Sequence, residues 1–164
     1  MRHKPQFAID TSVSVEKSEA EIKSILARHG ANQFGVVQDI YAGLASVQFI
    51  SAGRQIRFML ELPKRDSEDF WKTPSRGTKR DPAAAYRLWE QACRQRWRAL
   101  CLCIKAKLEA VAAGISEFED EFLAHVVLPN GKTVGETIRP EIEQAYLGNK
   151  GLVSIAGYLP APKV

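Results

Sequence analysis

A chain of 164 residues and 18.3 kDa, with 45% apolar and 26% charged residues, has the size and composition of one globular domain. These values exclude global disorder and collagen, and the longest apolar stretches are too short for a membrane-spanning helix. The net charge of +4 is unevenly distributed, because residues 54–107 carry 14 basic and 6 acidic groups whereas residues 108–164 carry 4 and 8.

After a polar arm at residues 1–10, the first elements are a strand and a helix. Valines alternate with polar residues over Thr11–Glu16, which predicts a short strand. Ser18 and Glu21 have the spacing of a capping box, so a helix is predicted from Ser18 to about His29, with Gly30 ending it.

Three segments with strand-like alternation follow, and the last two are joined by a short turn that contains Gly53. The predicted strands are Gln33–Gln38, Ala45–Ile50 and Gln55–Leu62. This order predicts a small antiparallel sheet that the preceding helix covers on one face.

Residues 63–82 form a long polar connection, in which Ser67–Trp71 is predicted to form one helical turn. Asp81 and Pro82 then suit the start of a long helix over Ala83–Ala113. Its apolar residues recur at steps of three and four, which predicts one continuous seam. The seam comprises Trp89, Cys93, Trp97, Leu100, Ile104, Leu108 and Val111. A helix this long is expected to protrude, to pair with another chain, or to break.

The remaining elements are a short helix at Ser116–Ala124, a tight turn or small hairpin over residues 126–134 and a final helix. Thr133 and Glu136 form a second capping-box pattern, and the final helix is predicted to end near Tyr146. Its apolar face comprises Ile138, Ile142, Ala145 and Tyr146.

Together these elements predict one α+β domain: a small antiparallel sheet packed with an N-terminal helix, then a helical C-terminal half built on one long amphipathic helix. The parts are a loose arm (1–10), a strand–helix–three-strand unit (11–62), a basic loop (63–82), a helical half (83–147) and an apolar, Pro-rich tail (148–164).

The basic groups of the middle segment predict a non-sequence-specific nucleic-acid interface, because arginine forks suit phosphates and a loop tryptophan suits an unpaired base. The candidates in the loop are Trp71, Lys72, Arg76, Lys79 and Arg80, and those on one side of the long helix are Arg87, Arg94, Arg98 and Lys105. Two alternatives remain open for these charges: a merely solvated face, or neutralisation by the acidic residues near 117–121.

The alternative function is a non-enzymatic interaction module, either an inhibitor of a host protein or a homo-oligomer built on the long helix. An enzymatic alternative would use Glu117, Glu121 and His125, which share one side of the short helix. An exposed acidic side is the more ordinary interpretation. The sequence holds no phosphate-binding loop, nucleophile elbow or paired Cys/His ligands, so we expect no cofactor and no metal. The three cysteines are expected to be free thiols.

Several stretches resemble a family of small uncharacterised proteins encoded by tailed phages and prophages. They are VSVEKSEAEI (13–22), WEQACRQRWRAL (89–100), IKAKLEAV (104–111) and EFLAHVVLPNGKTVGE (121–136). The resemblance covers most of residues 11–147 and implies a phage-type accessory protein in the bacterial cytoplasm. No apolar run follows the basic first residues, which agrees with a cytoplasmic location.

Overall fold

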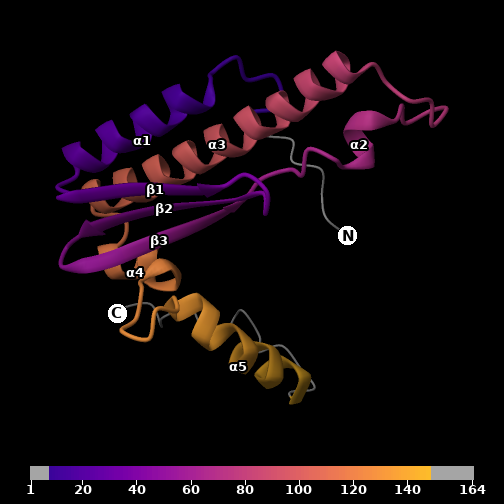
Figure 1. Cartoon of the computed structure of the whole chain (residues 1–164). Coiled ribbons are helices and arrows are strands. Elements are labelled where there is room, and N and C mark those ends of the chain that lie inside the picture. The colour runs from indigo at the N-terminus through magenta and orange to yellow at the C-terminus, as the bar shows by residue number, and fades with distance from the viewer. Residues whose placement is uncertain (1–7, 149–164) are drawn as a thin grey trace, which may run out of the picture.

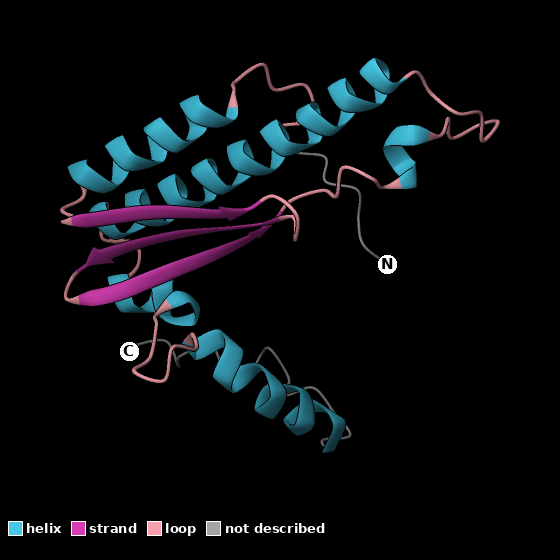
Figure 2. Cartoon of the chain, viewed as in Figure 1, coloured by secondary structure: helices cyan, strands magenta, loops and turns pink. Residues whose placement is uncertain are grey.

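The computed structural model describes residues 8–148, which form a three-stranded antiparallel sheet and a set of helices (Figures 1 and 2). The strands are β1 (Gln33–Asp39), β2 (Leu44–Ser51) and β3 (Arg54–Glu61), in the order β1-β2-β3. Two helices lie side by side on one face of the sheet, α1 (Val15–Arg28) and α3 (Pro82–Ala112) (Figure 1). The predicted α+β architecture is confirmed.

The core lies between this sheet face and the two helices. Alternate residues of the strands point into it, with Phe49 opposite Ile56 and Val47 opposite Phe58 in the register of β2 and β3. The helices contribute apolar residues to the same cluster, namely Ile22, Ile25, Leu26, Trp97, Leu100, Cys101, Ile104 and Leu108. Most of the predicted α3 seam is therefore buried within the chain and is not available to a second copy.

The start of α1 differs from the prediction, because residues 11–14 are not a strand and Ser18 is not the cap. Ser14 caps the helix by accepting the backbone N–H of Lys17 at 3.2 Å. Ser18 lies inside the first turns, where its hydroxyl donates to the Ser14 carbonyl at 3.1 Å. A serine cap that satisfies a free helical N–H outweighs a short alternating pattern that has no neighbouring strand. Val15 consequently packs against the core as a helical residue.

The β2–β3 connection is a hairpin turn that contains Gly53, as predicted, but it spans two residues and not the predicted four, because Ser51 and Arg54 belong to the strands. Ala52 and Gly53 have φ angles of 49° and 70°, and Ser51 pairs with Arg54. Two successive left-handed residues match the right-handed twist of the flanking strands, which fixes the hairpin register.

α3 is unbroken over 31 residues, and its N-terminal part extends past the end of the sheet (Figure 1). The Asp81 carboxylate caps it by accepting the N–H groups of Ala83 and Ala84 at 3.1 and 3.2 Å. Of the three expected outcomes for a helix this long, the structure shows protrusion. The protruding part carries the segment that connects the sheet to the helix, including α2 (Glu68–Trp71).

The C-terminal elements attach at the edge of β3. After α4 (Phe118–Phe122) and the 3-10 helix η1 (Leu123–His125), Val126 bridges to Ile56, and the predicted hairpin closes between Val127 and Thr133. α5 (Val134–Gly148) follows.

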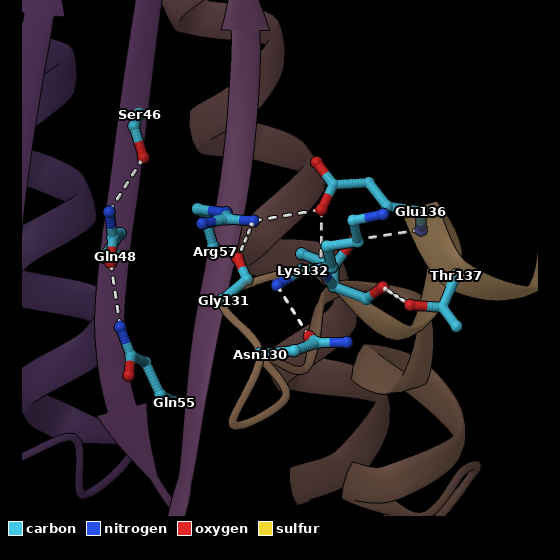
Figure 3. Close-up of polar contacts among 10 residues, drawn as sticks. Ser46, Gln48, Gln55, Arg57, Asn130, Gly131, Lys132, Glu136 and Thr137 are labelled. Atoms are coloured by element: carbon cyan, nitrogen blue, oxygen red, sulfur yellow. Dashed lines mark hydrogen bonds and ion pairs between the residues drawn. The ribbon is translucent and has the colours of Figure 1, made fainter.

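The predicted capping box at the start of α5 is confirmed. The Thr133 N–H donates to Glu136 Oε2 at 2.7 Å, and the Glu136 N–H donates to Thr133 Oγ1 at 3.1 Å. Glu136 Oε2 also accepts from Arg57 Nη2 at 3.0 Å, which ties α5 to β3 (Figure 3).

Beyond this attachment α5 projects away from the sheet (Figure 1). Its periodic apolar residues, which a core-facing helix would bury, are exposed: Ile138, Ile142, Tyr146 and Leu147. Residues 1–7 of the predicted arm and the predicted tail after Gly148 lie outside the described residues.

Candidate nucleic-acid interface

Three segments meet at the end of the molecule beyond the sheet: the β1–β2 turn at residues 40–43, the 62–81 connection with α2, and the N-terminal turns of α3 (Figure 1). All but two of the cations predicted to bind nucleic acid lie on the connection or on the first half of α3. The geometry of this end decides which of them face solvent.

Backbone and side-chain hydrogen bonds fold the second half of the connection into a short hairpin, here called the basic hairpin (Trp71–Arg80). Lys72 bridges to Lys79, and Arg80 N–H donates to the Trp71 carbonyl at 2.7 Å. Thr73 accepts at its hydroxyl from the N–H of Thr78 at 3.1 Å. The segment predicted as loop therefore folds back on itself as a hairpin, and its backbone carries the charged residues together.

The predicted cations of the basic hairpin have different surroundings. Arg76 and Lys79 are exposed. Lys72 is exposed but forms an ion pair with Glu68 at 2.5 Å. Arg80 is engaged internally, because its Nη1 donates to the carbonyls of Asp69, Phe70 and Lys72 at 3.0, 3.2 and 2.7 Å. Arg80 thus satisfies free carbonyls at the end of α2, a structural role that the sequence analysis did not predict.

The α3 residues predicted as a basic stripe do share one side of the helix, but most of that side is covered. Arg87 is exposed, whereas Arg94, Arg98 and Lys105 are half-buried. Arg98 forms an ion pair with Glu21 of α1. Arg94 donates to the Gln91 side chain at 2.6 Å. The stripe spacing predicted a shared side correctly and could not indicate that α1 lies against it.

A pocket of about 570 Å³ lies beside the basic hairpin and is here called the aromatic pocket. It is lined by Ile40, Tyr41, Lys64, Arg65, Asp66, Trp71 and Trp89. Tyr41 is fully exposed. Of these residues, only Trp71 was predicted from the sequence to be functional. Two features of the sequence could have indicated the other lining residues. They are the Ile40-Tyr41 pair shortly before Gly43 and the Lys64-Arg65 pair directly after Pro63.

The two indole rings of the aromatic pocket are held in place by hydrogen bonds to the connection. Trp71 Nε1 donates to the Arg65 carbonyl at 2.9 Å, and Trp89 Nε1 donates to the Pro63 carbonyl at 2.8 Å. Arg65 also lies over the ring of Tyr86, with its guanidinium carbon 4.8 Å from the ring centroid. The pocket walls are therefore pre-organised.

Two residues of the enzymatic alternative, Glu121 and His125, are engaged in contacts within the fold. Glu121 pairs with Lys107 at 3.1 Å, and hydrogen bonds from that lysine and from Ser116 lower the pKa of the Glu121 carboxyl. His125 stacks on Phe58 with ring centroids 3.9 Å apart. Burial, followed by the charge of Lys107, lowers the pKa of His125. Within residues 8–148 no three His, Cys, Asp or Glu side chains are grouped to hold a metal ion.

The three cysteines are free thiols, as expected. Cys93 and Cys101 are buried, and burial is the main cause that raises the pKa of each to about 11. Both are therefore protonated at neutral pH and behave as small apolar side chains.

No protein-family model, no curated protein and no solved structure matches this chain. In the part of the chain that the structure describes, no helix is both long and apolar enough to cross a membrane.

Proposed function

We propose that this protein binds nucleic acid without sequence specificity at the end formed by the basic hairpin, the Lys64–Arg65 pair and the first turns of α3. The observation that carries the proposal is a group of exposed cations that form no ion pair within residues 8–148. They are Lys64, Arg65, Arg76, Lys79 and Arg87.

The alternative of a merely solvated face explains paired charges better than it explains these five. Elsewhere on the protein, three cations of the basic middle segment are neutralised within the fold: Arg57 by Glu136, Arg98 by Glu21 and Lys107 by Glu121. The five cations that lie together at the proposed end retain their attraction for a polyanion. Each phosphate they contact releases condensed counterions, which is the main source of non-specific affinity.

The lack of sequence preference follows from the elements that carry the charges. The two exposed cations at the tip, Arg76 and Lys79, lie on a short hairpin and not on a helix, whereas the common sequence-specific proteins place a recognition helix in the major groove. Phosphate contacts of this kind position a protein on nucleic acid but do not distinguish bases. This activity agrees with the phage-type accessory role that the resemblance implies.

The test is fluorescence anisotropy with a labelled oligonucleotide at several salt concentrations. Wild-type protein is expected to bind at low salt, with an affinity that falls steeply as salt rises. The double variant Arg76→Ala/Lys79→Ala should bind more weakly and should reduce the salt slope by about 2, roughly 1 per lost phosphate contact.

The matched control is Lys23→Ala/Arg28→Ala, which removes the same charges from exposed positions on α1. The control should retain wild-type affinity and slope. The proposal is overturned if wild-type protein does not bind at low salt, or if the two double variants weaken binding equally.

A further inference from the structure

We infer that the nucleic acid is single-stranded and that one unpaired base enters the aromatic pocket and stacks on Tyr41, with the rings of Trp71 and Trp89 forming the pocket wall. The inference rests on the proposed function and adds the strand class and the residues that recognise it. It is carried by the pocket itself, which a purely electrostatic interface would not need.

The aromatic pocket combines the two features that single-strand binding requires, aromatic faces and adjacent cations. Tyr41 lines it from the β1–β2 turn, whereas Trp71 lines it from the end of α2. Lys64 and Arg65 are exposed and line the same pocket, so a base in the pocket would place its phosphates within their reach. Asp66 also lines the pocket, and these two cations outweigh its single negative charge.

The hydrogen bonds to the backbone make the indole rings suitable stacking surfaces. Trp71 and Trp89 each donate their indole N–H to a carbonyl of the 63–65 segment, so neither ring needs to be ordered on binding. A pre-organised wall lowers the entropic cost of association. Tyr41, in contrast, is fully exposed, so its ring is open to an incoming base.

A base inside a duplex is stacked on both faces and cannot reach such a pocket without being extruded, which costs free energy. An unpaired base has its faces free. The aromatic pocket therefore favours single strands, whereas the unpaired cations alone would favour the duplex, which has the higher charge density.

The experiment compares three labelled probes of equal length at one low salt concentration: a mixed-sequence single strand, its duplex, and a single strand of abasic residues. The abasic strand keeps the phosphates and removes the bases. Wild-type protein is expected to bind the mixed single strand about tenfold more tightly than the abasic strand, the range for one stacked base.

Tyr41→Ala should remove most of that difference by weakening binding of the mixed strand alone, whereas Tyr41→Phe should retain it. Because the Tyr41 side chain is fully exposed, truncation is not expected to affect folding, and circular dichroism checks this. The inference is overturned if wild-type protein binds mixed and abasic strands equally, if it prefers the duplex, or if Tyr41→Ala weakens both single strands alike or leaves the difference between them unchanged. Absence of binding to all three probes would instead overturn the proposed function.

Discussion

Arg98 of α3 forms an ion pair with Glu21 of α1, and both side chains are partly buried between the two helices. The arginine that spacing alone assigns to a nucleic-acid stripe therefore connects two helices of the core layer. Its Nη1 also lies 3.9 Å from the sulfur of the buried Cys101. The sequence does not distinguish an arginine that stabilises the fold from one that binds phosphate. The ion pair assigns Arg98 the stabilising role, and the two roles can be told apart by experiment.

Arg98→Ala should therefore lower stability and leave nucleic-acid binding unchanged. Removing one partner of a partly buried pair leaves the other carboxylate poorly solvated, so we expect a loss of about 1–2 kcal/mol in the free energy of unfolding. Urea denaturation of Arg98→Ala, Glu21→Gln and the double variant measures the coupling between the two side chains. Additive effects in that cycle, or weaker oligonucleotide binding by the folded Arg98→Ala protein, would contradict this assignment.

Gly135 lies in the first turn of α5, where replacement by alanine would normally stabilise a helix by about 0.5–1 kcal/mol. A Cβ at this position would lie 2.8 Å from the Ala124 carbonyl oxygen. Because backbone of η1 must shift to admit it, we expect Gly135→Ala to destabilise the protein by about 1–3 kcal/mol.

Gly35 provides the matched control for that substitution, since a Cβ there would meet no atom within 4 Å and the residue has no left-handed φ. Gly35→Ala should leave stability unchanged or raise it slightly, because alanine restricts the unfolded chain. Thermal unfolding of both variants measures the difference. A Gly135→Ala protein as stable as wild type would show that α5 does not pack closely on η1.

The regular elements could be predicted because each carries its own local signal. Alternation identified the three strands, and Asp81 with Pro82 identified the start of α3. The strand predicted at Thr11–Glu16 was wrong because two valines among serines fit either a strand or a capped helix start, and only the Ser14 cap decides between them.

The candidate site was less predictable because it depends on contacts between distant segments. Tyr41, Lys64 and Trp89 line one pocket although up to 48 positions separate them in the chain. The side on which Arg98 and Lys105 lie follows from helical periodicity, but the helix that covers this side does not. Similarly, periodicity predicted the apolar face of α5. Burial of that face requires another element to pack against it, and periodicity does not show whether such an element exists.

Ile104 and Ile142 provide a comparison of a buried and an exposed helical isoleucine. Ile104 of α3 is fully buried in the core cluster, whereas half of Ile142 on α5 is exposed. Ile104→Ala should cost about 2–5 kcal/mol, because it removes buried methyl groups and leaves a cavity. Ile142→Ala should change stability by less than about 1 kcal/mol. Equilibrium urea unfolding of both variants tests this, and equal losses would mean that α5 is packed in solution.

His125 gives the protein a predictable response to mild acid. Burial against Phe58 and the charge of Lys107 hold the pKa of His125 below its ordinary value of 6.5. Below pH 6.5 the unfolded chain therefore binds a proton more readily than the folded protein. The stabilising contribution is complete above that value and is lost as the pH falls through the folded pKa.

The free energy of unfolding should thus decrease as the pH is lowered from 7 to 5. His125→Gln should make this dependence on pH weaker, because it removes the titrating group. Proton NMR of the imidazole measures the folded pKa directly, and a value at or above 6.5 would refute the prediction. The loss of stability caused by His125 can be distinguished from the loss caused by Glu136, because the Glu136 carboxyl is protonated only at lower pH. Its pKa is held below 4.5, chiefly by the hydrogen bond from the Thr133 N–H, so its contribution is lost only at more acidic pH.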